Sequence, residues 1–116
     1  MSDVEVEGTT QLLKGVLDLA VLAVLAGRDS YGYDVVRRLR ECGLCGVGDA
    51  SVYGTLRRLH QAGALASYAV ASAEGPHRKY YGLNDGGRAL LARSARAWSS
   101  VTGAMDRLLD GMEADR

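Results

Sequence analysis

One short hairpin signal interrupts a chain that is otherwise patterned for helices. Glu74, Gly75 and Pro76 form a turn sequence between two short extended segments, over about 65–73 and 77–83. Helical patterning lies on both sides of this hairpin. A single ribbon set among helices restricts the chain to a mainly α fold with a small β-hairpin.

Three helices are predicted before the hairpin. The first begins at Leu12 and is expected to end at Gly27, and it is apolar on two adjacent stripes. The second is predicted over 31–42, with Ser30 as its N-cap. The third is predicted over 49–62, because its apolar residues recur at intervals of three and four.

One long helix is predicted after the hairpin, over 85–112, with Asn84 as its cap. The order helix, helix, turn, helix, hairpin, helix is that of a winged helix-turn-helix, in which the hairpin is the wing. The predicted organisation is a flexible tail over 1–10, a DNA-binding domain over 11–83 and a C-terminal dimerisation helix over 84–116.

The charges of the chain are unevenly distributed. Its formal net charge is zero, but residues 12–100 carry twelve basic and seven acidic side chains, a net charge of +5, and both ends are acidic. A basic body suits a phosphate-binding surface. The acidic start and the absence of a long apolar run predict a cytoplasmic protein with no membrane partner.

The exposed side of the predicted third helix suits a DNA groove. Ser51, Tyr53 and Thr55 come early, where a recognition helix meets base edges, and Arg57 and Arg58 follow. The alternative interpretation is that the two arginines form an ordinary solvated face. Tyr53 can equally be a core residue with its hydroxyl group at the surface.

The predicted wing adds basic side chains near its tip. His77, Arg78 and Lys79 can straddle a phosphate or enter the adjacent minor groove. A winged helix used only for protein contacts is the alternative. No nucleophile, base and orienting group occur together and no phosphate-binding glycine loop is found, so we expect neither an enzyme nor a cofactor.

Cys42 and Cys45 form a CxxC motif, which can indicate a redox pair or half of a zinc site. Zinc needs four ligands, and only His60 and His77 could join the two thiols. No metal site is therefore expected. The simpler interpretation is two small, partly buried thiols between helices, and a thiol-based, redox-responsive regulator is the alternative.

An apolar seam with heptad-type spacing runs along the predicted last helix. A helix of this length projects beyond a body of this size, so we predict a homodimer formed through the seam. The alternative is that the helix packs wholly on the first helix of its own chain. The seam consists of Leu91, Ala95, Trp98, Val101, Met105, Leu108 and Met112.

The only tryptophan of the chain, Trp98, lies midway along this seam. With Ala95 and Met105 beside it and a symmetry mate across the dimer axis, it could form a slot for a planar aromatic or cationic small molecule. The simpler interpretation is that Trp98 only anchors the dimer interface.

These segments together resemble the PadR family of bacterial transcriptional regulators over about residues 12–112. No single stretch is specific for this family, but the order and spacing of all the stretches together are. The matching stretches are 12–18 (LLKGVLD), 31–34 (YGYD), 51–59 (SVYGTLRRL), 62–65 (AGAL) and 75–83 (GPHRKYYGL).

The resemblance implies a winged helix that dimerises through its C-terminal helix and usually represses a nearby promoter. We therefore expect a sequence-specific repressor of a pseudo-palindromic double-stranded DNA operator, released by a small-molecule effector. Some family members bind planar drugs between paired tryptophans, and Trp98 matches that position. Gly54 departs from the proline common after the tyrosine, and Gly48 departs from the hydroxyl-bearing cap common before the third helix.

The resemblance also carries roles onto individual positions. Ser51, Tyr53 and Arg57 correspond to recognition residues, and Arg78 and Lys79 correspond to wing contacts. With the residues chosen for their chemistry, the predicted DNA-binding set is Tyr31, Ser51, Tyr53, Thr55, Arg57, Arg58, His77, Arg78 and Lys79.

Overall fold

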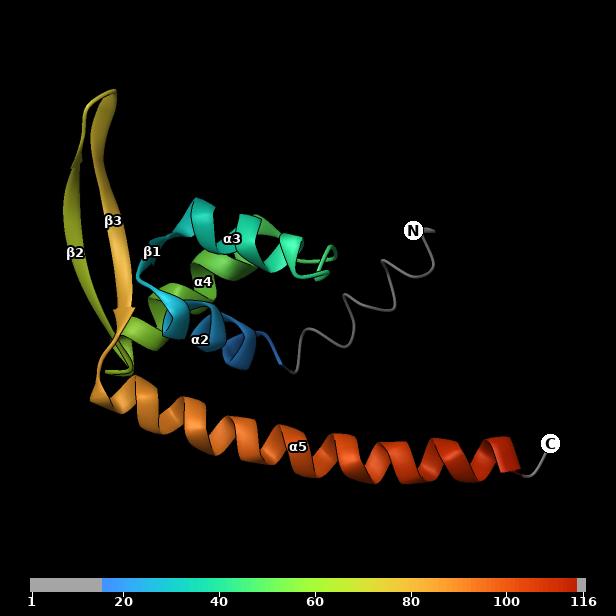
Figure 1. The fold of residues 1–116 in the computed structure, drawn as a ribbon. Coiled ribbons are helices and arrows are strands. Elements are labelled where there is room, and N and C mark those ends of the chain that lie inside the picture. Colours follow the sequence, from blue (N-terminus) through green and yellow to red (C-terminus); the bar gives the residue numbers. More distant parts are fainter. Residues whose placement is uncertain (1–15, 115–116) are drawn as a thin grey trace.

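The structure, a computed structural model, describes residues 16–114 of the chain. Within this range three helices are followed by a hairpin and one long helix (Figure 1). The predicted mainly helical winged fold is confirmed. The predicted tail over 1–10 and the predicted helix start at Leu12 lie outside the described residues. The elements are α2 (Leu17–Gly27), β1 (Ser30–Tyr31), α3 (Gly32–Glu41), α4 (Asp49–Gln61), β2 (Leu65–Ser72), β3 (Gly75–Leu83) and α5 (Asp85–Ala114).

Helices α2, α3 and α4 enclose the hydrophobic core, and the base of the sheet closes it. Burial of one large aliphatic side chain contributes about 1.5–3 kcal/mol to the free energy of unfolding, so this core holds α4 in place. Its buried residues are Val21, Leu22, Leu25, Val35, Val36, Leu39, Val47, Val52, Leu56, Leu59, Ala64, Leu65 and Tyr81.

The hairpin is part of a three-stranded antiparallel sheet in the order β1-β3-β2. Strand β3 pairs with β2, and β1 places Ser30 opposite Tyr81 and Tyr31 opposite Tyr80. The sequence predicts only two of these strands, because a strand of two residues is too short for an alternating pattern to show. The additional strand ties the wing directly to the start of α3.

Ser30 does not cap α3, so this prediction is wrong. The residue is fully buried in β1, and its hydroxyl oxygen accepts a hydrogen bond from Nη1 of Arg38 at 2.6 Å. Tyr31 occupies the N-cap position and makes no side-chain capping bond. Serine is favoured at an N-cap because its hydroxyl oxygen accepts a hydrogen bond from a free backbone N–H. Here that oxygen accepts a hydrogen bond from the Arg38 side chain instead.

The predicted capping of the last helix by Asn84 is confirmed. Its Oδ1 accepts a hydrogen bond from the backbone N–H of Gly87 at 2.9 Å, and its Nδ2 donates to the carbonyl of Gly63. A Cβ at Gly87 would lie 2.1 Å from the carbonyl oxygen of Ala64, so glycine permits this close approach. The start of α5 is thereby fixed against the segment that joins α4 to the wing.

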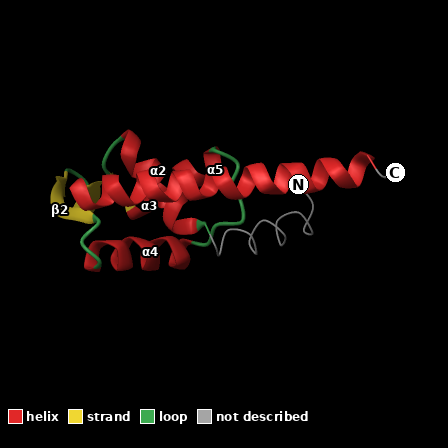
Figure 2. Cartoon of the chain, turned by 90° about the horizontal axis from the view of Figure 1, so that it is seen from below, coloured by secondary structure: helices red, strands yellow, loops and turns green. Residues whose placement is uncertain are grey.

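Helix α5 lies against the body over its first half. Leu90 and Leu91 lie on the core, whereas the second half runs past the other helices (Figures 1 and 2). The molecule is accordingly elongated, with extents of 59 × 33 × 20 Å. In the described range no helix combines the length and apolarity needed to cross a bilayer.

Candidate nucleic-acid interface

Helix α4 presents one polar side to solvent and one apolar side to the core. Ser51, Tyr53 and Arg57 are exposed, and the opposite side is buried. Within the described part of the chain, Arg57 forms no ion pair. Its guanidinium group is therefore free to meet an anion.

Tyr53 packs directly against the start of α3. A Cβ built on Gly32 would lie 2.1 Å from Cε1 of the Tyr53 ring. The ring therefore lies in the space that the missing side chain leaves, while Tyr53 stays 39 % exposed. Both interpretations of the residue hold in part, because one side of the ring is packed and the other side reaches solvent.

Thr55 does not belong to the exposed surface, so its predicted place there is wrong. It is 5 % exposed, and its Oγ1 donates a hydrogen bond to the carbonyl of Ser51 at 2.8 Å. A threonine hydroxyl within a helix readily bonds the carbonyl four residues earlier. Position 55 also falls beside the buried stripe of Val52, Leu56 and Leu59.

Arg58 is engaged within the chain. Its two terminal nitrogens donate to both carboxylate oxygens of Asp18 on α2, at 2.8 and 2.5 Å. Hydrogen bonding from Arg58 has the largest effect and, with the smaller effect of its charge, holds the pKa of Asp18 below the ordinary value of 3.8, although partial burial raises it. Contact of Arg58 with DNA stays a prediction, and it requires exchange of this partner for a phosphate.

The wing carries its basic residues exposed, as predicted for His77, Arg78 and Lys79. The guanidinium carbon of Arg78 lies 4.5 Å from the centre of the Tyr31 ring, and Nζ of Lys79 lies 5.4 Å from that of Tyr81. Both separations are within the range of cation–π attraction. The structure therefore brings the predicted residues Tyr31 and Arg78 together.

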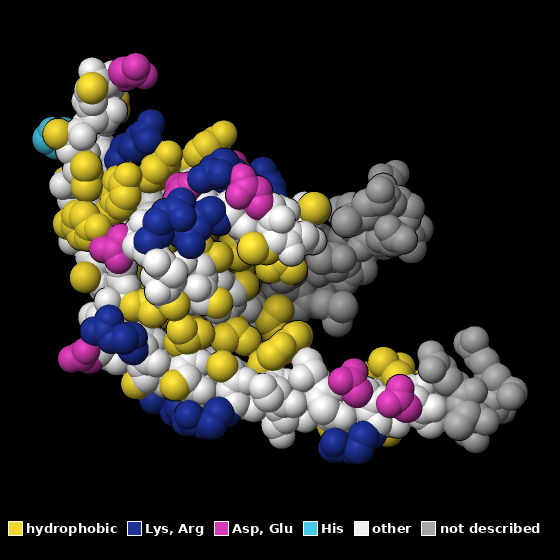
Figure 3. Space-filling view, in the orientation of Figure 1, with side chains coloured by type: hydrophobic (Ala, Val, Ile, Leu, Met, Phe, Trp, Pro, Cys, Tyr) yellow, Lys and Arg dark blue, Asp and Glu magenta, His cyan; other side chains and the backbone are white. Residues whose placement is uncertain are grey.

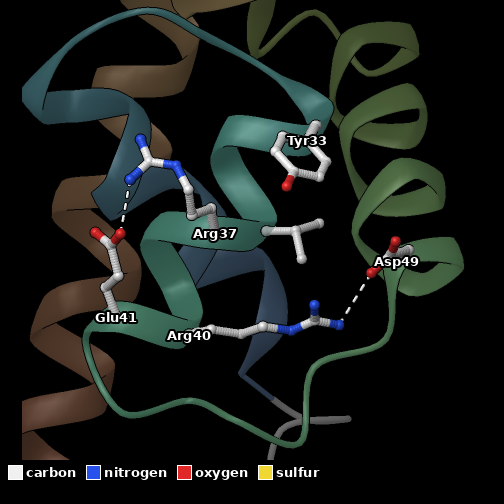
Figure 4. A pocket seen from close by; sticks show the side chains of 6 residues that line it. Tyr33, Arg37, Arg40, Glu41 and Asp49 are labelled. Carbon is white, nitrogen blue, oxygen red and sulfur yellow. Dashed lines mark hydrogen bonds and ion pairs between the residues drawn. The ribbon is translucent and has the colours of Figure 1, made fainter.

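A groove of about 330 Å³ lies between α3 and the start of α4 (Figure 4). Tyr33, which is 63 % exposed, lies on its upper rim. Arg40 reaches across and donates to Oδ1 of Asp49 at 2.9 Å, and Arg37 pairs with Glu41 at 2.6 Å. Arg40 therefore joins α3 to α4, whereas the Arg37 pair lies within α3, and the two arginines give this face a basic border.

Sequence reasoning missed this groove. Tyr33, Arg37 and Arg40 recur at intervals of four and three, which places them on one side of α3. That spacing was the available signal.

Trp98 is 47 % exposed and lines two grooves between α5 and α2. Figure 3 shows hydrophobic side chains gathered where α5 meets the body. The larger groove, of about 410 Å³, is lined by Asp18, Ser94 and Val101 among others. Ala95 and Met105, predicted beside the ring, line neither groove in the single chain.

The two thiols of the CxxC motif are exposed, which corrects the prediction of partial burial. They lie between α3 and α4, and Sγ of Cys45 contacts the carbonyl oxygen of Arg40 at 3.9 Å. Leu44 between them packs against the core, so the backbone turns both thiols outward. No group of three metal-ligating side chains occurs among the described residues. A redox role for the pair stays a prediction.

The predicted seam of α5 divides into two parts. Leu91 lies against the core of its own chain, and Ala95 is exposed beyond it. Large apolar side chains farther along the helix are 45–65 % exposed, and Leu109, which the heptad spacing omits, is among them. They are Trp98, Val101, Met105, Leu108, Leu109 and Met112.

Comparison with known proteins agrees with this architecture. The model of the transcriptional regulator PadR-like family matches residues 21–93. A PadR-like transcriptional regulator of Bacillus cereus is 32 % identical, with a TM-score of 0.77 over 85 % of this chain and 96 % of that one.

Two further proteins are similar over most of their length. A PadR family regulator of Eggerthella lenta is 29 % identical, with a TM-score of 0.80 over 92 % of this chain and 93 % of that one. An uncharacterised protein of Lysinibacillus sphaericus is 26 % identical over 106 residues, which are 90 % of this chain and 97 % of that protein. The family match spans more than half of the chain, and its members are regulators of transcription rather than enzymes. The chain belongs to the PadR-like family of transcriptional regulators.

Proposed function

We propose that this regulator binds a specific, pseudo-palindromic DNA operator as a homodimer in the cytoplasm. The observation that carries the proposal is the combination of an exposed polar side on α4 with an exposed basic wing on the same chain. In a winged helix-turn-helix the second helix of the turn unit, here α4, enters the major groove, and the wing then reaches the neighbouring backbone or minor groove.

The contacts divide into three groups. Ser51, Tyr53 and Arg57 meet base edges or phosphates in the major groove, because hydroxyl and guanidinium groups pair with both. The wing residues Arg78 and Lys79, with His77, meet the next stretch of DNA. Tyr33, Arg37 and Arg40 border the groove of Figure 4 and contact the phosphate backbone crossed by α3.

The dimer forms through the exposed part of α5. Several large apolar side chains on one helix, without cover among the described residues, would expose apolar area that a second copy removes from water. A two-fold axis that runs between the two α5 helices presents two α4 helices and two wings to one face of the DNA. Such a dimer demands an operator with the same symmetry.

We further propose that the regulator is a repressor released by a small molecule bound beside Trp98. The grooves around this ring lie between α5 and α2, and the second chain would bring Ala95 and Met105 of both copies to the slot. A ligand there shifts the distance between the two α4 helices only if it prefers one dimer arrangement. A planar aromatic or cationic compound that quenches Trp98 fluorescence and lowers DNA affinity would support this; quenching without that loss assigns Trp98 to the interface alone.

DNA binding is tested by fluorescence anisotropy, at several salt concentrations, with a labelled duplex that carries the promoter region of the protein's own gene. Arg57→Ala and Lys79→Ala should each weaken binding about tenfold and, for a lost phosphate contact, reduce the salt slope by roughly one unit. Arg93→Ala is the matched control, because this exposed arginine lies on α5, away from the wing. If neither variant differs from the control, α4 and the wing are not the DNA surface. If the wild type binds no DNA, the fold serves protein contacts instead.

A further inference from the structure

Two adjacent residues at the start of α3 each contact a different element of the DNA surface. Tyr31 contacts Arg78 of the wing, and Gly32 contacts Tyr53 of α4. We infer that Tyr31 and Gly32 are a positioning pair, which sets the wing cation and the recognition helix relative to one another. This inference rests on the proposed function, because it concerns how the two DNA-binding elements are aligned.

The wing side of the pair is an aromatic row across all three strands. Tyr31 in β1 lies opposite Tyr80 in β3, which lies opposite Tyr68 in β2. The ring centres are 5.3 Å apart for Tyr31 and Tyr80 and 5.8 Å apart for Tyr80 and Tyr68. Aromatic pairs at such separations attract one another beyond their buried area, so the row resists sliding of the strands.

The far end of the row is also held. The Tyr68 hydroxyl donates a hydrogen bond to Oδ2 of Asp29 at 2.6 Å, and this bond raises the pKa of Tyr68. Asp29 itself fits because position 82 is glycine, where a Cβ would lie 2.3 Å from its Oδ1. Asp29 stands one residue before β1, so the loop that leads into Tyr31 is fixed to the opposite strand of the wing.

Arg78 lies above the Tyr31 end of this row. A long side chain on an exposed hairpin would otherwise sample many rotamers, and ordering it on DNA would cost entropy. The 4.5 Å approach to the Tyr31 ring reduces that cost, because the side chain is already ordered on the α3 side of the wing.

Gly32, the second residue of the pair, acts on α4 through the space that it leaves for the Tyr53 ring. Because the ring fits there, α3 and α4 meet closely one residue after the wing contact. A change at either residue should therefore disturb one DNA element specifically. Tyr31 governs the position of Arg78, and Gly32 governs that of Tyr53.

The first test needs no DNA. The side-chain methylene protons of Arg78, measured by NMR in the wild-type protein, should show upfield ring-current shifts relative to Arg93. The shifts should persist in Tyr31→Phe, which keeps the ring, and vanish in Tyr31→Leu. Unshifted Arg78 protons in the wild type would overturn the inference whether or not the protein binds DNA.

The second test is a double-mutant cycle on DNA affinity, by anisotropy with the same labelled promoter duplex. Tyr31→Leu should weaken binding about three- to fivefold, the size of a cation–π contact, and Tyr31→Phe less than twofold. In an Arg78→Ala background, Tyr31→Leu should have no further effect. Equal losses from Tyr31→Leu with and without Arg78 would show that Tyr31 acts independently and would reject the positioning role.

The outcomes separate the two proposals. If Arg78→Ala binds DNA as tightly as the wild type, while the ring-current shifts are present, the wing contact of the proposed function fails and the positioning geometry stands. If Tyr31→Leu does not fold, the wild-type NMR shifts and the affinity of Tyr31→Phe still decide the inference.

Discussion

Position 32 has no room for a side-chain carbon, whereas position 54 has ample room. A Cβ at Gly32 would meet the Tyr53 ring at 2.1 Å, and a Cβ at Gly54 would meet nothing within 4 Å. Gly32→Ala should lower the free energy of unfolding by about 1–3 kcal/mol through overpacking. Gly54→Ala should raise it by about 0.5–1 kcal/mol, because alanine is the better residue inside a helix. Urea denaturation at one fixed protein concentration measures both.

The cause of the Gly32 effect can be isolated with a second change. Adding Tyr53→Ala to Gly32→Ala removes the ring that clashes, so the double variant should lose less stability than the two single losses added together. Additive losses would mean that the ring yields freely and that Gly32 is not selected by this contact.

Individual side chains were also where sequence reasoning was weakest. The exposure of Ser51, Tyr53 and Arg57 follows from helical periodicity and is confirmed. The burial of Thr55 and the pairing of Arg58 could not be predicted, because each depends on a neighbour. For Arg58 that neighbour, Asp18, is forty positions away in sequence.

At the scale of elements, one ion pair joins α2 to α4. The pKa of Asp18 is lowered in the folded chain by hydrogen bonding to Arg58, so the pair stabilises the fold fully above pH 3.8. This contribution is lost as the pH falls through the lower folded-state value. Because both side chains are about half exposed, Asp18→Asn should cost only about 0.5–1 kcal/mol at pH 7.

The check is the difference in unfolding free energy between wild type and Asp18→Asn, measured by denaturation from pH 7 down to pH 3. The difference should be constant near neutrality, shrink below pH 3.8 and decrease in high salt. A difference that grows as the pH falls would have the wrong sign for this pair. If DNA phosphates compete for Arg58, Asp18→Asn should also tighten DNA binding.

Most elements were predictable because each has a long local signal. Periodicity indicated the helices, and Asn84 indicated the start of α5. The turn signal at Glu74, Gly75 and Pro76 indicated the hairpin but not its exact turn, because Gly75 and Pro76 already belong to β3 and the turn lies at Ala73 and Glu74. Strand β1 was not predictable, because its two residues are extended only through pairing with β3. The groove between α3 and α4 depends on how two helices dock, which no local pattern encodes.

At the scale of the whole molecule, the second half of α5 extends past the body, and its large apolar side chains are exposed in the described chain. Leu108 is 65 % exposed on its projecting half, so Leu108→Glu should place a charge in the dimer interface and yield a monomer in sedimentation velocity. Ser100→Glu is the matched control, because it adds the same charge about 200° around the helix from Trp98. Unchanged dimer affinity in Leu108→Glu would place the interface elsewhere.

The central claim is that two copies of this chain read one symmetric DNA site with α4 and the wing. The most direct measurement is selection of bound sequences from a random pool of double-stranded DNA, using the wild-type protein. We predict an enriched pseudo-palindrome whose half-sites are about one helical turn, or a multiple of it, apart. Leu108→Glu should lose the paired half-sites. A pool without enrichment, or an enriched motif with no two-fold symmetry, would contradict the claim.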